Sequence, residues 1–243
     1  MKFIIITFMF CLVSLTTMVG QTNAIEVNYS LTLKPIKSQA PNAEFVKSIV
    51  KSLKPYEDRI TYQLIVNQGL SRFKTKPIMD SDLNPGLLPS LQLHADASTV
   101  YYQNQQDEYY YKFLHSRSFS GIVIKDHFKK FNWRIDNQKI KTILGYKCYL
   151  ATASFSADGI KKNIKVWFSP KININSGPMY YNGLPGLILA YQDRHRYLEA
   201  KKISFNSIKT IKQPKVEQYY TEDEFLKLVK NKMKRFGFDP SKK

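Results

Sequence analysis

The stretch Ile25-Glu26-Val27-Asn28-Tyr29-Ser30-Leu31-Thr32-Leu33 alternates apolar and polar side chains without interruption. Successive side chains of a β-strand point to opposite faces, so this pattern predicts a strand with one buried and one hydrated face. The same alternation returns in Ile60, Tyr62, Leu64 and Val66. We therefore expect two half-buried strands near the start of the fold.

Several short runs rich in Tyr, Ile, Val and Phe follow between Ser98 and Phe168, separated by turn-forming segments such as Asp136-Asn137. Asp158-Gly159 is the strongest of these turn signals and predicts a hairpin between residues 149–155 and 160–168. The predicted fold class is α+β, mainly antiparallel β. We expect a curved sheet or half-barrel meander with one N-terminal covering helix and a C-terminal helix.

Two segments have the features of helices. In the first, one face is shared by Phe45, Val46, Ile49, Val50 and Leu53, and Lys54-Pro55 ends the pattern. In the second, Thr221-Glu222-Asp223-Glu224 is a capping box ahead of a helix with a basic C-terminal end. The first helix is expected to cover one face of the sheet. The second is expected to dock on the domain or to make a peripheral membrane contact.

Residues 1–20 have the pattern of a secretory signal peptide, with one charge at Lys2, an apolar run from Phe3 to Val13 and a polar, small-residue tail. Cleavage after Gly20 and cleavage after Ala24 both fit. Residues 21–243 are expected to form a single β-rich domain. No later stretch approaches the roughly 20 apolar residues of a spanning helix. The expected location is therefore periplasmic or extracellular.

Loss of the signal peptide also removes Cys11, which leaves Cys148 as the remaining cysteine and excludes an intramolecular disulfide. Cys148 lies in the apolar run Tyr146-Lys147-Cys148-Tyr149-Leu150. We interpret it as a small buried apolar residue on a strand, with a reactive or metal-bound thiol as the alternative.

The formal net charge is +18, and 14% of the residues are aromatic. In a cytoplasmic protein this combination would suggest nucleic acid binding, but the export signal argues against a nucleic acid partner. The basic residues are spread along the chain rather than clustered, which is typical of a solvated cationic surface. Outside the cytoplasm, anionic lipid headgroups and acidic glycans are the alternative partners of such a surface.

The densest set of special residues is Ser-Gly-Pro-Met-Tyr-Tyr-Asn-Gly-Leu-Pro-Gly-Leu-Ile-Leu, at positions 176–189. Asn182-Gly183 tolerates positive φ, and Pro185-Gly186 is predicted to form the centre of a type II turn, with Gly186 left-handed. The chain then enters Leu187–Tyr191, a continuously apolar strand that requires cover on both faces. The expected structural motif comprises Gly177, Pro178, Gly183, Leu184, Pro185, Gly186, Leu187 and Ile188.

Residues 183–188 spell the hexapeptide that names the GLPGLI family of exported proteins, found largely in Bacteroidetes, and the chain resembles that family. Neighbouring residues stand in the same order as in the family: Trp133, Lys139-Ile140, Gly145-Tyr146-Lys147-Cys148, Ala151, Trp167 and Gly177-Pro178. The resemblance therefore spans roughly residues 132–193. One departure is Lys161-Lys162, where the family leads us to expect an arginine. The resemblance implies an extracytoplasmic location and a curved antiparallel sheet wrapped on a helix, similar to bacterial lipoprotein-carrier half-barrels. It implies no established activity.

The sequence lacks the motifs of metalloproteases, α/β-hydrolases, P-loop proteins and paired-cysteine zinc sites, so neither an enzyme nor a cofactor is expected. Asp193 and His195 offer at most a two-ligand start to a metal site, and no metal is expected. A hydrolytic enzyme would require residues distant in sequence to converge.

Two binding hypotheses are therefore open. The first is a carrier whose concave apolar face takes up a lipid-like or other apolar ligand, lined by Trp133, Tyr146, Trp167, Leu187 and Leu189. The second is a protein-interaction partner of an outer-membrane assembly. In that case the protein's own helix fills the concave face, and an exposed basic edge of the sheet does the binding.

Overall fold

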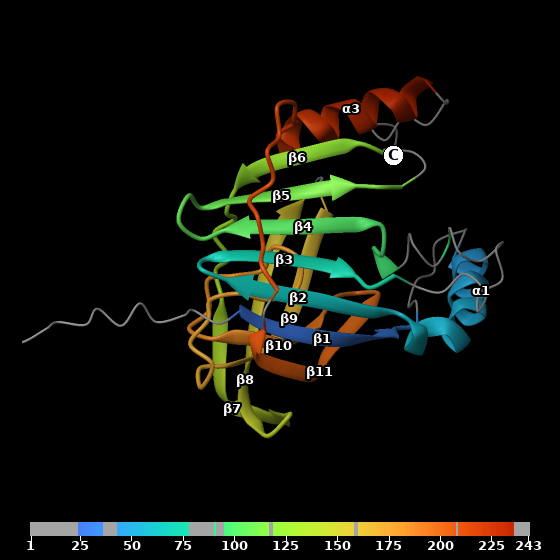
Figure 1. The fold of residues 1–243 in the computed structure, drawn as a ribbon. Helices are drawn as coiled ribbons and strands as arrows, with labels where there is room; N and C mark the ends of the chain where they lie inside the picture. Colours follow the sequence, from blue (N-terminus) through green and yellow to red (C-terminus); the bar gives the residue numbers. More distant parts are fainter. Residues whose placement is uncertain are drawn as a thin grey trace, which may run out of the picture.

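The computed structural model describes residues 24–35, 43–77, 90, 95–116, 119–157, 160–207 and 209–235. The predictions for residues 1–20 lie outside this part of the chain. Eleven strands form one antiparallel sheet in the order β6-β5-β4-β3-β2-β1-β11-β10-β9-β8-β7 (Figure 1). The strands are β1 (Ala24–Leu33), β2 (Thr61–Asn67), β3 (Leu70–Thr75), β4 (Thr99–Asn104), β5 (Tyr109–Leu114), β6 (Ile122–His127), β7 (Arg134–Ile143), β8 (Tyr146–Ala157), β9 (Ile160–Ser169), β10 (Leu187–Gln192) and β11 (Arg196–Ser207). The predicted α+β class, mainly antiparallel β in a curved sheet, is confirmed.

The sheet consists of two meanders joined at their first and last strands. Strands β1 to β6 follow one another in space, strands β7 to β11 do the same, and β1 pairs with β11. The connection after β6 therefore carries the chain from one edge of the sheet to the other. Consequently β6 and β7, neighbours in sequence, are the two edge strands.

The local patterns agree with the observed strands, with one exception. Tyr149 lies opposite Phe168 and Ala157 opposite Ile160, which confirms the hairpin predicted around residues 158 and 159. Asp136-Asn137, however, does not end a strand. It opens an irregularity inside β7, where the Asp136 Oδ1 accepts the backbone N–H groups of Gln138 and Lys139 at 3.1 and 3.2 Å. The side chain of Asp136 supplies the turn within a continuing strand.

The sheet curls on itself, so that β8 and β9 run across the inner face of the first meander (Figure 1). Alternation along the strands places Tyr29, Tyr62, Phe73 and Tyr101 on this inner face, where all four are buried. The rings of Tyr62 and Phe73 stack with centroids 5.3 Å apart. The core is thus built largely from aromatic side chains, which bring large apolar areas and specific ring geometry.

The N-terminal helix α1 (Ala43–Leu53) continues into the 3₁₀ helix η1 (Lys54–Arg59). Val50 and Leu53 are buried, and the Glu57 Oε2 accepts the backbone N–H of Leu33 at 2.7 Å. Figure 1 places the pair beside the ends of β1 and β2. The predicted covering helix therefore exists, and it covers the ends of the strands rather than the middle of a face.

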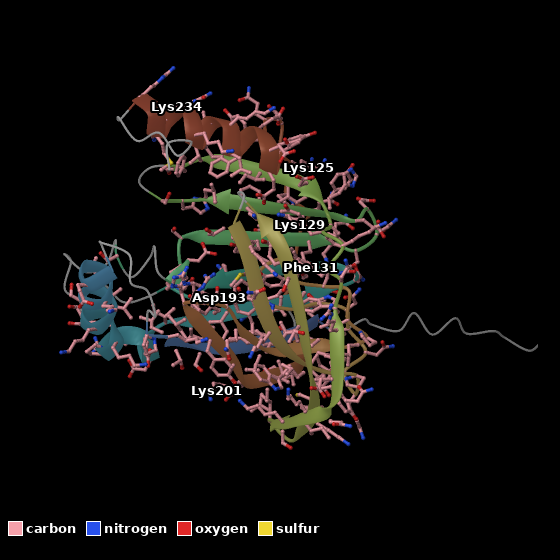
Figure 2. All side chains as sticks on the ribbon, turned by 180° about the vertical axis from the view of Figure 1, so that it is seen from behind. Lys125, Lys129, Phe131, Asp193, Lys201 and Lys234 are labelled. Carbon is pink, nitrogen blue, oxygen red and sulfur yellow. The ribbon has the colours of Figure 1, made fainter. Side chains whose placement is uncertain are left out.

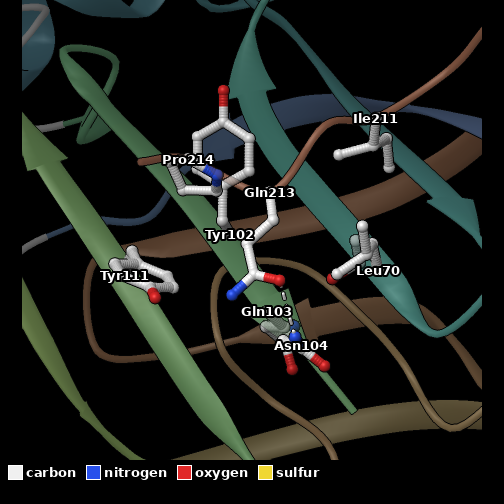
Figure 3. A pocket seen from close by; sticks show the side chains of 9 residues that line it. Leu70, Tyr102, Gln103, Asn104, Tyr111, Ile211, Gln213 and Pro214 are labelled. Carbon is white, nitrogen blue, oxygen red and sulfur yellow. Dashed lines mark hydrogen bonds between the residues drawn. The ribbon is translucent and has the colours of Figure 1, made fainter. Parts of the chain in front are cut away.

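The C-terminal segment, residues 209–220, crosses the outer face of the first meander and leads to α3 (Glu222–Arg235) beside β6 (Figure 1). Lys209 pairs with Glu26 at 2.8 Å, and the amide of Asn104 donates to Gln213 Oε1 at 3.1 Å. Figure 3 shows Gln213 and Pro214 over this face of the sheet. The segment therefore acts as a strap that holds α3 at the β6 edge.

The start of α3 has the predicted capping box. Thr221 donates its backbone N–H to Glu224 Oε2 at 2.8 Å, and Glu224 donates its backbone N–H to Thr221 Oγ1 at 3.3 Å. No residue of α3 is fully buried, so the helix docks shallowly. None of the helices in the described segments is both long enough and apolar enough to cross a bilayer.

Candidate functional site

The centre of the curved sheet is filled by the protein's own side chains. Tyr180 and Tyr181 come from the turn before β10, and the Tyr180 ring stacks on Tyr110 with centroids 5.0 Å apart. The ring of Tyr181 stacks on Tyr191 at 4.9 Å, and Phe131 lies 5.3 Å from Tyr181. Among the described residues, these rings occupy the space that the carrier hypothesis assigned to a ligand. The filling is aromatic side chains of a loop rather than a helix.

The five residues predicted to line a ligand site do not share one surface. The Trp133 indole N–H donates to the backbone oxygen of Asn182 at 2.8 Å, which ties the β6–β7 connection to the turn before β10. Trp167 lies on the other face of the sheet, packed edge-on against Tyr197 at 6.2 Å. Tyr146 is half-buried, and Leu187 and Leu189 are fully buried. Their role in ligand binding stays a prediction, and what the structure shows is packing.

The motif at 177–188 is held by close backbone packing. Gly183 has φ +85°, as its turn signal predicted, and it lies against the Trp133 ring. Gly186 has φ +151°, and its backbone N–H donates to the Leu184 oxygen at 2.8 Å. A type II turn requires φ of about +80° at this position, so that prediction is wrong. Glycine is required here because a Cβ atom would lie 2.2 Å from the Ser169 oxygen.

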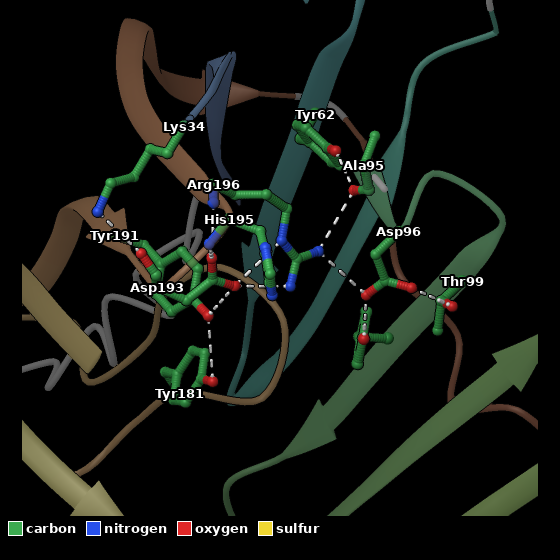
Figure 4. A network of polar contacts seen from close by, with 11 residues as sticks. Lys34, Tyr62, Ala95, Asp96, Thr99, Tyr181, Tyr191, Asp193, His195 and Arg196 are labelled. Carbon is green, nitrogen blue, oxygen red and sulfur yellow. Dashed lines mark hydrogen bonds and ion pairs between the residues drawn. The ribbon is translucent and has the colours of Figure 1, made fainter. Parts of the chain in front are cut away.

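A partly buried ionic network joins the β10–β11 turn to residues 95–101 (Figure 4). The Arg196 guanidinium donates to Asp193 Oδ2 at 2.9 Å and lies 3.6 Å from Asp96 Oδ2. The hydroxyl of Tyr191 also donates to Asp193, at 2.9 Å, and that of Tyr101 donates to Asp96. Burial raises the pKa of Asp193, but the charge of Arg196 and the hydrogen bonds from His195, Arg196 and Tyr191 together outweigh burial and lower the pKa below its usual value.

The same network bears on the metal hypothesis at Asp193 and His195. The Asp193 Oδ1 accepts the backbone N–H of His195 at 2.7 Å and that of Arg196 at 2.6 Å. Both carboxylate oxygens are therefore engaged by donors of the turn itself. In the described part of the chain, no three His, Cys, Asp or Glu side chains are placed to share a metal ion.

Cys148 is fully buried, as predicted. Burial raises the pKa of its thiol to about 11, against the smaller opposing effects of a backbone hydrogen bond and Lys141. A thiol with this pKa is almost entirely protonated at neutral pH, which disfavours both nucleophilic attack and metal binding.

A cationic cluster that the sequence did not indicate lies at the β6 end of the inner face. Lys112 points inward from β5, and its Nζ lies 4.5 Å from the Tyr180 ring centroid and forms an ion pair with Glu222. Glu222 also accepts the Tyr110 hydroxyl at 2.9 Å, while Lys129 lies 5.6 Å from the Tyr180 ring. We call Tyr110, Lys112, Lys129, Tyr180 and Glu222 the lysine–tyrosine cluster. No local signal could have found it, because 110 residues separate Lys112 from Glu222.

The opposite edge, β7, is apolar and basic. Ile135 and Ile140 are 43% and 50% exposed, and they pair with the inner-face residues Ala151 and Tyr149 of β8. They therefore extend the apolar inner face to the border of the sheet. On the outer face, Lys141 contacts Glu199 of β11.

A shallow depression lies at the β2–β3 turn. It has a volume of about 380 Å³ and is open to solvent. Its walls include Ile25, Val66 and Ile174, with Asn67, Gln68, Gly69, Gln105 and Asn175.

A short segment of the chain matches a known family model, and most of the chain is similar in fold to solved structures. Residues 156–190 match the model of a family described as "Protein of unknown function (Porph_ging)". The match includes the hexapeptide at 183–188 but does not establish the GLPGLI name. The chain is also similar to two solved structures of PNGF-II. In the C2 space group the identity is 14% and the TM-score 0.49, over 78% of this chain and 28% of that chain. In the P21 space group the identity is 15% and the TM-score 0.48, over 78% of this chain and 29% of that chain. The chain thus spans less than a third of those chains, and no curated protein matches its sequence.

Proposed function

We propose that this chain is an exported, non-enzymatic protein-interaction module of the GLPGLI type that acts in the periplasm or outside the cell. It binds an extended segment of an outer-membrane partner along the edge of β7. The observation that carries the proposal is the contrast between the two sheet edges. The pattern of residues 1–20 motivates the location.

The β6 edge is covered by the chain itself. Tyr220 forms a parallel bridge to Ile124, in which Lys125 donates its backbone N–H to the Tyr220 oxygen and Tyr220 donates to Val123, both at 2.9 Å. Among the described residues, no such bridge covers β7, whose ladder partner is β8. An uncovered edge strand can pair with an extended segment of another protein.

The chemistry of the β7 edge defines the partner segment. Ile135 and Ile140 would contact apolar side chains on one face of an added strand. On β7, the basic residues Arg134, Lys139 and Lys141 outnumber the single acid, Asp136. The complementary occupant is an extended segment in which apolar residues alternate with acidic ones. The same lysines and the irregularity at Asp136 would also serve to prevent aggregation, so the experiment must separate recognition from mere protection of the edge.

The test places a photo-crosslinking amino acid at Ile140 in the native cell envelope. A discrete adduct is expected, with the crosslink mapped by mass spectrometry to an extended acidic segment of one partner. Phe205, which is 47% exposed at the end of β11, is the matched control and should give none. Adding Arg134→Glu and Lys139→Glu should abolish the adduct. If Ile140 and Phe205 give the same products, or none, the β7 edge is only a protected edge and the proposal fails.

The depression beside Gly69 supports a second candidate, a carrier of a lipid-like or apolar ligand. Its apolar walls, Ile25, Val66 and Ile174, suit such a ligand. Native mass spectrometry of protein purified from its own envelope should then show bound lipid, and Val66→Lys should remove it. A bare mass for the wild type, with no uptake of an apolar dye, would exclude this candidate.

A further inference from the structure

Lys112 has an unusual position for a lysine. It points from β5 to the inner face of the sheet, where its neighbours on adjacent strands are Tyr101 and Ile124, and its side chain is 13% exposed. An ammonium group removed from water requires a compensating anion. Glu222, at the first position of α3, supplies that carboxylate.

The anion comes from a weakly docked element. Glu222 itself is well enclosed, with its side chain 17% exposed, but no residue of α3 is fully buried. Besides the strap, α3 is held by Phe225, whose ring packs edge-on against Phe119 at 5.2 Å, and by Lys232, whose Nζ lies 4.8 Å from the centroid of the Phe119 ring. Asp126 adds a hydrogen bond, because it accepts the Glu222 backbone N–H at 3.2 Å. Elements with so few buried contacts open at low free energy. The Glu222 carboxylate is therefore enclosed, although the helix that carries it lies on the surface.

The surroundings of Glu222 suit an acidic group in general. Lys112 and the Tyr110 hydroxyl both donate to Glu222 Oε1, and the charges of Lys112 and Lys129 lower the pKa of Glu222 despite its burial. Figure 2 shows Lys129 and Phe131 near one another on the connection that follows β6. Lys162 adds positive charge near Tyr180, while Asp126 is the second acid beside Glu222. Of these groups around Tyr110 and Tyr180, three are basic and two are acidic.

The backbone next to Glu222 shows how a longer ligand would lie. Tyr220 adds a short parallel bridge to the β6 edge, and two residues later the carboxylate enters the cluster. An extended peptide with a residue paired to Ile124 and an acid two positions later reproduces both contacts.

We propose that the lysine–tyrosine cluster and the β6 edge form a peptide-binding site for an acidic extended segment, and that the chain's own residues 219–222 occupy this site in the free protein. A partner segment competes with Glu222 and releases α3. This site is distinct from the β7 edge and does not depend on the function proposed there. The strap keeps the internal segment at high effective concentration, so a partner binds only when it is itself abundant or tethered.

The test uses the full chain and a fluorescent peptide with the sequence of residues 217–225, Glu-Gln-Tyr-Tyr-Thr-Glu-Asp-Glu-Phe. Glu222→Gln removes the charge of the internal competitor, so peptide affinity by fluorescence anisotropy should increase roughly tenfold, because a charge-assisted contact no longer holds the site closed. Glu224→Gln is the matched control. It removes the same charge from the same turn, and glutamine preserves the capping box.

The lysines of the site are then substituted in turn. In the Glu222→Gln background, Lys112→Met and the half-buried Lys129→Met should each weaken peptide binding, and a peptide with glutamine at its position 222 should bind poorly to all variants. If circular dichroism shows that Lys112→Met does not fold, the peptide affinity of Lys129→Met alone tests the site. Hydrogen exchange in residues 222–235 should increase when the peptide is added.

Two outcomes would overturn the proposal. One is equal peptide affinity in Glu222→Gln and Glu224→Gln, which would make Glu222 a structural anchor of α3 only. The other is that light scattering shows Glu222→Gln to be a dimer that added peptide does not dissociate. The site would then bind the strap of a second copy rather than a partner segment.

Discussion

Gly186→Ala gives the sharpest test of how the chain is held at residues 177–188. The added Cβ would lie 2.2 Å from the Ser169 oxygen, 2.6 Å from the Ser169 carbonyl carbon and 2.8 Å from the Pro170 Cα. All three atoms belong to the backbone, so no side-chain rotation can relieve the overlap. The φ of +151° adds a conformational cost.

The magnitude follows from two contributions. An alanine held at positive φ costs about 1 kcal/mol relative to glycine. Forcing an extra carbon into a packed interior costs about 1–3 kcal/mol more, and the backbone contacts here place the site at the upper end. We therefore expect Gly186→Ala to lower the free energy of unfolding by about 3–4 kcal/mol, which for a domain of this size lowers Tm by roughly 6–16 °C.

Gly145→Ala is the matched control. Gly145 also has positive φ, +80°, but an added Cβ would meet no atom within 4 Å, so only the conformational cost of about 1 kcal/mol applies. Urea unfolding followed by circular dichroism measures both variants. Equal losses of stability in the two variants would refute the argument, because close packing of Gly186 on Ser169 and Pro170 would then contribute nothing.

Three further outcomes are expected. Arg196→Met leaves the partly buried Asp193 and Asp96 without their cation and should cost about 3 kcal/mol in urea unfolding, whereas a loss below about 1 kcal/mol would show that the network is effectively solvated. Glu199 is partly buried, which raises its pKa, but hydrogen bonds from Lys141, Lys201 and Tyr197 lower it to about 2. Because the folded pKa lies below the unfolded value, this contribution is complete above about pH 4.5 and is lost as the pH falls towards 2. Glu199→Gln should therefore flatten the pH dependence of stability in that range, and an unchanged slope would contradict the assignment. Native Cys148 should not react with Ellman's reagent at pH 8 but should react fully after unfolding, and rapid native labelling would show that it is accessible.

Local periodicity determined much of the fold. Alternation in residues 25–33 and 60–66 predicted β1 and β2, and the Asp-Gly pair predicted the β8–β9 hairpin. The capping box predicted the start of α3, and the apolar run around Cys148 predicted a buried thiol. These features depend on contacts between residues close in sequence, which a pattern of side chains records directly.

Only the tertiary structure decided the order of the strands, the two edges of the sheet and its curvature. Pairing of β1 with β11 makes β6 and β7 the edges, and curvature brings Tyr180 against Tyr110 and Glu222 against Lys112. The sequence also placed Trp133 and Trp167 on one ligand surface, whereas Trp133 contacts the turn before β10 and Trp167 packs against Tyr197 of β11. A strand's alternation fixes which residues share a face, but it does not reveal the strand order, the curvature or the loop that fills the interior. Those depend on contacts between residues tens to hundreds of positions apart, which leave no local periodicity in the chain.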